Sequence, residues 1–162
     1  ELRRSRGDPE AFLIHSLPTD RPPQYLVTGG LVIEELTRDY LKTWGDDWKN
    51  RANKKFLYDF YYRAEESRPG RERIVILTQV LPDEINTGYQ DLGDIVLARV
   101  NGKPIGRLRD VAEALRSPLG GFQVFEFEEH GRRAVLPAKA LAEADRRIAE
   151  RYRIPSLSRL DE

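Results

Sequence analysis

Residues 94–105 read Asp94-Ile95-Val96-Leu97-Ala98-Arg99-Val100-Asn101-Gly102-Lys103-Pro104-Ile105 and join a strand, a tight turn and the approach to a helix. The apolar residues before the turn form a short run of strongly β-favouring side chains. Asn-Gly is the residue pair that most readily supplies two positive φ angles in a hairpin, so we expect the chain to reverse at Asn101-Gly102. This order of elements is typical of a binding module rather than of an enzyme.

A helix is predicted over residues 107–116, directly after this turn. Its apolar residues Leu108, Val111, Ala112 and Leu115 recur at the three-and-four spacing of one helical face. An amphipathic helix normally turns such a stripe toward the protein core, which favours a core role for Leu108, Val111 and Leu115. Ala112 is the better candidate for a residue that lines a groove.

The rest of the chain predicts an α+β fold. Short apolar runs bounded by Gly, Pro or polar residues indicate strands, and these runs are 11–14, 25–28, 31–36, 94–100, 122–128 and 132–136. Residues 73–81 are nearly continuous in apolar side chains, which favours a central strand buried on both faces. Residues 82–91 are expected to form a loop that can include one helical turn, and His130-Gly131 is expected to turn a hairpin.

Two longer segments predict helices. Residues 47–65 carry apolar side chains at helical spacing, and Asp46 and Asp47 stand where a cap and a favourable first-turn charge are expected. Alternating aromatic residues in the same segment leave a strand open as the alternative. The last helix is predicted over residues 137–152, and Pro155 ends it.

Four further blocks carry a family resemblance, at residues 22–33, 39–41, 75–81 and 85–89. In this order, and together with the run described first, they resemble the C-terminal PDZ-like domain of Do-like (HtrA/Deg) serine proteases of the plant type. The resemblance covers roughly residues 10–158. It implies an extended PDZ-like α+β domain, with a small twisted sheet or partial barrel of roughly five to seven strands capped by helices.

The resemblance also implies boundaries along the chain. Residues 1–10 are expected to form a flexible N-terminal segment, 11–158 a single domain and 159–162 a tail. Within the domain we expect a helical insertion at about 39–71 and a C-terminal helix at about 137–152. The insertion is much longer than a compact PDZ domain needs, so it could cover a peptide groove or dock onto another domain.

The composition of the 162-residue chain restricts its partners. Lys plus Arg equals Asp plus Glu at 27 each, so no net charge attracts nucleic acid or an acidic membrane surface. No apolar run approaches the ~18 residues of a membrane span. Met is absent even at position 1, which predicts that the chain begins inside a longer protein or after processing. We therefore expect no nucleic-acid partner and no membrane partner.

Signals for catalysis and cofactors are weak. A Do-like protease needs a serine in a Gly-Asn-Ser-Gly-Gly context, because the hydroxyl must be deprotonated and its oxyanion held by backbone N–H groups. No serine here has that context, and His15 and His130 are expected to be structural. The chain has neither Cys nor a His cluster for zinc, and its glycine pairs lack the Lys-Ser/Thr of a phosphate-binding loop. We expect no enzyme activity of its own, no metal and no cofactor.

The resemblance implies where a peptide would bind. Residues 25–30 would be the carboxylate-binding loop, 31–35 the strand that pairs with the peptide, and the predicted 107–116 helix the opposite wall of the groove. Gly29 and Gly30 could turn successive N–H groups toward one anion, although strand glycines also mark bulges. The candidate binding residues are Tyr25, Leu26, Val27, Gly29, Gly30, Leu31, Ile33, Leu108, Ala112 and Leu115.

Two functions follow from the resemblance. The leading one is a module that binds a peptide or an unfolded protein segment and regulates, or presents substrate to, a serine protease domain elsewhere in the parent chain. The alternative is a structural module for oligomerisation or domain docking, with an occluded groove and a second copy as a partner. The protease family also implies an extracytoplasmic (periplasmic) or organellar location.

Overall fold

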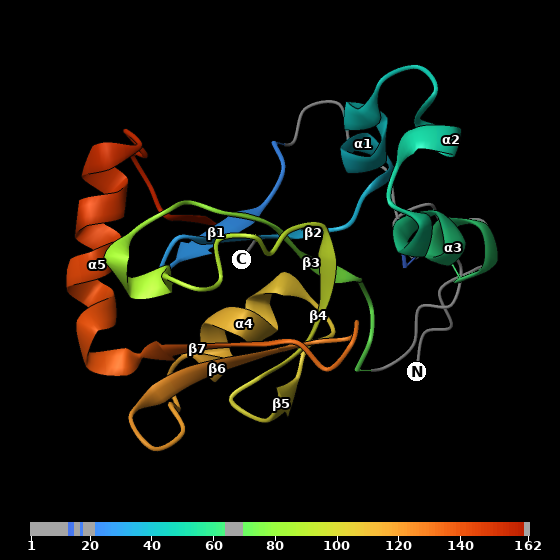
Figure 1. Cartoon of the computed structure of the whole chain (residues 1–162). Helices are drawn as coiled ribbons and strands as arrows, with labels where there is room; N and C mark the ends of the chain where they lie inside the picture. Colours follow the sequence, from blue (N-terminus) through green and yellow to red (C-terminus); the bar gives the residue numbers. More distant parts are fainter. Residues whose placement is uncertain (1–12, 15–16, 18–21, 64–69, 161–162) are drawn as a thin grey trace.

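In the computed structural model, which describes residues 13–14, 17, 22–63 and 70–160, one antiparallel sheet is flanked by helices (Figure 1). The strands are β1 (Tyr25–Thr28), β2 (Leu31–Glu35), β3 (Val75–Val80), β4 (Ile95–Val100), β5 (Lys103–Pro104), β6 (Phe122–Phe127), β7 (Arg133–Pro137) and β8 (Ser158–Arg159). The helices are α1 (Arg38–Leu41), α2 (Trp48–Arg51), α3 (Lys54–Arg63), α4 (Leu108–Ala114) and α5 (Ala138–Arg151), with 3-10 turns η2 (Lys42–Trp44) and η3 (Glu84–Asn86). The predicted α+β class is confirmed.

The sheet has eight strands in the described part of the chain, in the order β7-β6-β4-β3-β2-β1-β8 with β5 beside β4. That is one strand more than the upper end of the predicted range. The strand that the sequence did not indicate is β8, two residues that pair antiparallel with β1. Arg159, the first residue of the predicted tail, belongs to this strand.

The central strand is β3, which has three strands on either side of it along the sheet. Its side chains alternate between two hydrophobic clusters: Val75 and Leu77 belong to the larger one, and Ile74 and Ile76 flank them in the smaller one. A strand that supplies apolar side chains to both faces must be apolar nearly throughout. The prediction of a strand buried on both faces is therefore confirmed.

The larger cluster lies between the sheet and α4, and the Asn101-Gly102 turn is tied to it. Asn101 and Gly102 have φ angles of 51° and 77°, as the Asn-Gly pair predicted. The buried amide of Asn101 donates to the carbonyl of Ala114 at 2.9 Å and to Oε1 of Gln123 at 2.6 Å, while its oxygen accepts from the N–H of Val124. The turn thus fixes the C-terminal end of α4 against β6.

The segment after β2 is helical, but the single helix predicted over 47–65 is wrong, because α2 and α3 are separate. Ala52 has an extended backbone with ψ of 162°, which ends α2. The side chain of Asn53 then accepts from the N–H of Lys55 at 2.8 Å, as a cap does. The alternative of a strand is also wrong. Residues 64 and 65 lie outside the described part of the chain.

The smaller cluster lies under these helices. Its fully buried members include Leu41, Phe56, Ile76 and Ile14. Leu13 and Ile14 form a bend rather than the end of the strand predicted over 11–14, and residues 11 and 12 lie outside the described residues, as do the predicted segment 1–10 and His15.

Helix α5 confirms the last predicted helix to within a residue at each end, and it packs its Ala144 and Ile148 inward. Residues in the second half of α5 and just after it anchor the loop that follows β3: Arg147 donates to Asp83, and Tyr152 Oη donates to the carbonyl of Pro82. The predicted helical turn in that loop is η3. Among the described residues, no helix has the length and apolar character that a membrane crossing requires.

Candidate protein-binding edge of the sheet

Gly29 and Gly30 form the two-residue turn that joins β1 to β2. Thr28 pairs with Leu31 on either side of it, and the glycine φ angles of 56° and 84° are those of a type I′ turn. The alternative of a bulge at this position is therefore wrong. The register shift of β2 lies instead between Val32 and Ile33, where β2 faces β3.

An anion does lie at this turn, and the chain supplies it. The N–H of Gly29 donates to Oδ1 of Asp145 on α5 at 2.7 Å. Burial raises the pKa of the Asp145 carboxyl, and the hydrogen bond from Gly29 opposes that rise. The carbonyl of Gly29 is used as well, because it accepts from Nδ2 of Asn86 at 2.9 Å.

β2 is the predicted pairing strand, but it is paired on both sides, by β1 and by β3. A peptide cannot add to β2 while β1 is in place, because strand addition needs an unpaired edge. Residues 25–28, which the resemblance assigned to a carboxylate-binding loop, are the strand that closes this edge. The strands predicted over 25–28 and 31–36 are confirmed, and they pair with each other across Gly29-Gly30.

Helix α4 lies within the predicted 107–116 helix, and it packs against both β1 and β2. The N–H of Leu108 donates to Oε1 of Glu35 at 3.1 Å, which joins the start of α4 to the end of β2. Leu108 and Val111 are fully buried, whereas Ala112 and Leu115 are partly buried against the larger cluster.

The structure brings most of the candidate residues together around this hairpin. Leu26, Leu31, Ile33 and Leu108 lie in the larger cluster, and Ala112 and Leu115 pack on its margin. These apolar side chains are core members in the present arrangement. Whether any of the candidate residues contacts a peptide stays a prediction.

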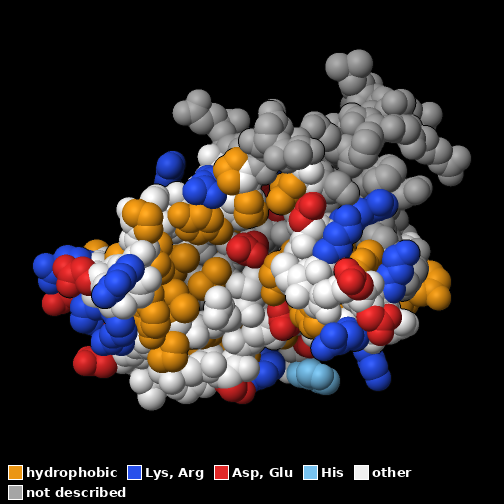
Figure 2. All heavy atoms as spheres, turned by 90° about the horizontal axis from the view of Figure 1, so that it is seen from above, with side chains coloured by type: hydrophobic (Ala, Val, Ile, Leu, Met, Phe, Trp, Pro, Cys, Tyr) orange, Lys and Arg blue, Asp and Glu red, His pale blue; other side chains and the backbone are white. Residues whose placement is uncertain are grey.

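The outer edge of β1 is covered by the C-terminal segment, which sequence reasoning missed. Tyr25 pairs with Arg159 and Leu26 with Ser158, and the N–H of Val27 donates to the carbonyl of Leu157 at 2.7 Å. A two-residue strand after Pro155 carries no periodic signal, so the sequence offered nothing to detect it. In Figure 2, hydrophobic side chains gather beside α5 on the face above this hairpin, with charged side chains around them.

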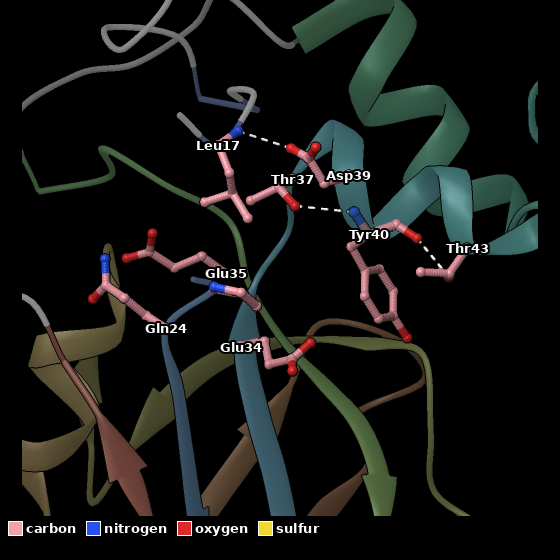
Figure 3. Close-up of a pocket in the computed structure, with 9 residues that line it drawn as sticks. Leu17, Gln24, Glu34, Glu35, Thr37, Asp39, Tyr40 and Thr43 are labelled. Atoms are coloured by element: carbon pink, nitrogen blue, oxygen red, sulfur yellow. Dashed lines mark hydrogen bonds between the residues drawn. The ribbon is translucent and has the colours of Figure 1, made fainter. Parts of the chain in front are cut away.

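A cavity of about 300 Å³ lies at the start of β1, between the sheet and α1 (Figure 3). It is lined by Leu17, Pro23, Gln24, Glu34, Glu35, Thr37, Asp39, Tyr40 and Thr43. Burial raises the pKa of the Glu34 carboxyl. Burial also raises the pKa of Tyr40, and so does the hydrogen bond that its hydroxyl donates to Asp94 at 2.7 Å.

The polar groups of this cavity are mostly hydrogen-bond acceptors. Asp39 already accepts from the N–H of Leu17, and Thr37 from the N–H of Tyr40. Such a lining favours a cationic or hydrogen-bond-donating group. No group of three metal-ligating side chains occurs in the described part of the chain. His130 lies in the exposed β6–β7 turn, as predicted, with φ of 55°.

A family model and several known proteins are similar to this chain. The family model described as PDZ domain matches residues 14–159. The chain is 32% identical over 134 residues to the chloroplastic protease Do-like 2 of Arabidopsis thaliana, which is 83% of this chain and 21% of that protein.

Two further relatives agree. The chain is 28% identical over 134 residues to the putative mitochondrial protease Do-like 12 of Arabidopsis thaliana, covering 83% of this chain and 22% of the relative. It is 30% identical over 105 residues to a serine protease DegP homolog of Plasmodium falciparum, covering 64% and 11% respectively. The chain thus spans about a fifth or less of the length of these relatives.

Proposed function

Because this chain belongs to the PDZ domain family, a family of protein-interaction modules, we propose that it is the non-catalytic docking module of a Do-like serine protease. Its partners are then the protease domain of the same parent chain and the segments that this protease processes. The relatives named as chloroplastic and mitochondrial support an organellar location for the parent protein.

The pairing of β2 on both sides is the observation that carries this proposal. Capture of a free C-terminus at β2 needs an open edge and free amide donors at the preceding turn. Here β1 holds the edge, and the amide of Gly29 is bound to Asp145. The geometry therefore favours docking through the outer surface, with the β2–α4 groove occluded, over capture of C-terminal peptides in that groove.

A binding experiment tests this function. The chain is immobilised and exposed to a library of peptides with free C-termini, and separately to the protease domain of the parent protein. We expect saturable binding of the protease domain and no saturable binding of C-terminal peptides. Ala112→Arg, which places a bulky charge on the groove side of α4, should leave both results unchanged.

Three outcomes would contradict the proposal. Saturable binding of C-terminal peptides that is lost in Ala112→Arg would show that the groove is open. Failure to bind the protease domain, together with unchanged casein cleavage by the parent protease when the chain is added in excess, would remove the regulatory role. Casein hydrolysis by the purified chain would show that the domain is catalytic.

A further inference from the structure

The strand that covers the outer edge of β1 is short and exposed. β8 contributes two residues, Ser158 and Arg159, and both side chains are solvent-exposed. Hydrogen-bonded and non-bonded pairs alternate in an antiparallel ladder. The Val27–Leu157 bond therefore makes Tyr25–Arg159 the next bonded pair, and Leu26–Ser158 a pair whose backbone groups point away from each other.

Side-chain contacts give this segment a defined chemistry. The guanidinium of Arg159 lies over the ring of Tyr25, 5.4 Å from its centroid. Leu160 packs, partly buried, against the larger hydrophobic cluster. The hydroxyl of Tyr25 donates to the carbonyl of Ser156 at 2.6 Å. The edge thus recognises a backbone, a cation and an apolar side chain in consecutive positions.

The covering segment can leave without unwinding α5. Arg153, with φ of 54°, ends the helix in the left-handed conformation, and the N–H of Ile154 donates to the carbonyl of Ala149 at 2.9 Å. This is the hydrogen-bond pattern of a Schellman cap. The helix itself is held by Arg147 on Asp83 and by Asp145 on Gly29. The residues after Ile154 can therefore move away from β1 while α5 stays folded and in place.

We propose that the outer edge of β1 is a strand-addition site for an extended protein segment that contains arginine followed by leucine, and that residues 156–160 are its built-in, displaceable occupant. The segment pairs its backbone with Tyr25 and Val27. Its arginine lies on the Tyr25 ring, and its leucine takes the place of Leu160 on the larger cluster. This site is distinct from the β2–α4 groove.

The cavity at the start of β1 extends the specificity of this edge. Continuing the register places the residue after the leucine opposite Pro23, at a wall of the cavity that also holds Glu34 and Asp39. A lysine or arginine there meets hydrogen-bond acceptors. The chain's own sequence continues with Asp161-Glu162, so a partner segment with cations at those positions has an advantage over the built-in occupant.

The test uses the whole chain and the labelled peptide Ile-Pro-Ser-Leu-Ser-Arg-Leu-Lys-Lys. Arg159→Pro removes the N–H that pairs with the carbonyl of Tyr25, and so weakens the occupant. Ser158→Pro is the matched control, because the N–H at that position points away from β1. When residues 156–160 occupy the edge of β1, only the molecules whose edge is open can bind the peptide. The apparent affinity for the peptide is therefore the intrinsic affinity multiplied by the fraction of molecules with an open edge.

We expect Arg159→Pro to bind the peptide about tenfold more tightly than the wild-type chain, and Ser158→Pro to behave as the wild type. Replacing the arginine of the peptide by glutamate should weaken binding to Arg159→Pro. In hydrogen exchange, the Val27 amide should exchange faster in Arg159→Pro and be protected again by the peptide.

Equal affinity of the two proline variants would overturn the proposal, and so would an unchanged exchange rate of the Val27 amide in Arg159→Pro. A mass that rises with concentration in Arg159→Pro without peptide binding would also overturn it, in favour of exchange between copies of the chain. The inference rests on the proposed interaction role. Its test involves no protease domain, so its failure leaves docking to that domain standing.

Discussion

Gly30 shows how tightly single residues are constrained around the hairpin. A Cβ at this position would overlap Nδ2 of Asn86 and the carbonyl oxygen of Leu81, and φ is +84°. Gly102 has a similar φ of +77°, but open space around it. We expect Gly102→Ala to lower the free energy of unfolding by about 1–2 kcal/mol through backbone strain alone.

Gly30→Ala should lower the free energy of unfolding clearly more than Gly102→Ala. At Gly30 the overlap adds to the backbone strain that both variants share, and it separates Asn86 from its acceptors. Urea unfolding of both variants measures the difference. An equal loss of unfolding free energy in the two variants would mean that the atoms around Gly30 move aside without destabilising the fold.

Asp83 is the residue whose charge holds α5 to the loop after β3. Its carboxylate is 0% exposed and accepts from Arg147 at 2.9 Å and from the N–H of Ile85 at 3.0 Å. The hydrogen bond from Arg147 lowers the pKa of Asp83, against the opposing effect of burial. Because the folded pKa lies below the unfolded value of about 3.9, its stabilisation is present above that value and is lost as pH falls through the folded pKa.

Asp83→Asn should therefore lower the free energy of unfolding by about 1–2 kcal/mol at pH 7 and flatten the acid side of the stability profile below about pH 4. Asp91→Asn is the matched control: Asp91 also pairs with an arginine, Arg132, but is exposed to solvent. It should change neither quantity measurably. Thermal melts between pH 2.5 and 7 measure both variants. If Asp91→Asn lost as much stability as Asp83→Asn, the result would contradict the role of burial.

For single residues, the sequence predicts the backbone geometry that adjacent residues determine, but it does not identify hydrogen-bond partners that lie far along the chain. Both positive φ angles at Asn101-Gly102 followed from the residue pair, because they depend on two adjacent residues. The anion at the amide of Gly29 was anticipated as a ligand group. It is Asp145, 116 residues away, and no local pattern could identify it.

Among the elements, the break between α2 and α3 depends on the side chain of Asn53. Its oxygen accepts from the N–H of Lys55, and its nitrogen donates to the carbonyl of Asp94 at 3.1 Å. Asn53→Ala should lower the free energy of unfolding by about 1–2 kcal/mol, because it removes a cap and a link to the strand that follows.

Asn50→Ala is the control for this element, since Asn50 is exposed and bonds to Asp47 within its own turn. Its effect should stay within about 0.5 kcal/mol. Circular dichroism and urea unfolding check both variants. If Asn50→Ala cost as much as Asn53→Ala, the link to Asp94 would not matter.

Elements with a sustained period were predictable, and those defined by tertiary contacts were not. α4, α5 and β3 follow from apolar spacing over six or more residues. The predicted 47–65 helix failed at one capping residue inside a compatible pattern. β8 exists because β1 offers an edge beside it, so nothing in residues 158–159 alone could reveal it.

For the molecule as a whole, two hydrophobic clusters share β3 and β4. Ile95 and Leu97 belong to the larger cluster, and Val96 between them to the smaller. Both tryptophans, Trp44 and Trp48, pack against the smaller one, so their fluorescence reports that cluster while circular dichroism reports all elements. Because the strands are common to both, we expect the two signals to follow one cooperative transition.

Phe56→Ala should lower the free energy of unfolding by about 3–5 kcal/mol, equally by fluorescence and by circular dichroism, since Phe56 is fully buried in the smaller cluster. Tyr62→Ala, at a side chain 71% exposed, should shift neither. Loss of the fluorescence transition alone would show that the helical segment between β2 and β3 unfolds as an independent unit.

The two-faced burial of β3 also bears on errors in folding. In a strand with one polar face, a slip of one residue would put apolar side chains into water, and this penalty fixes the alignment. In β3, a slip of one residue exchanges Val75 and Leu77 with the apolar Ile74 and Ile76, and it puts the polar Gln79 in place of Val80 only at the C-terminal end of the strand. Its alignment depends instead on polar contacts at one end, where Leu81 donates to Gly30 and Asn86 bridges the carbonyls of Gly29 and Leu81. Hydrophobicity makes this strand central, and one buried amide keeps it from misaligning.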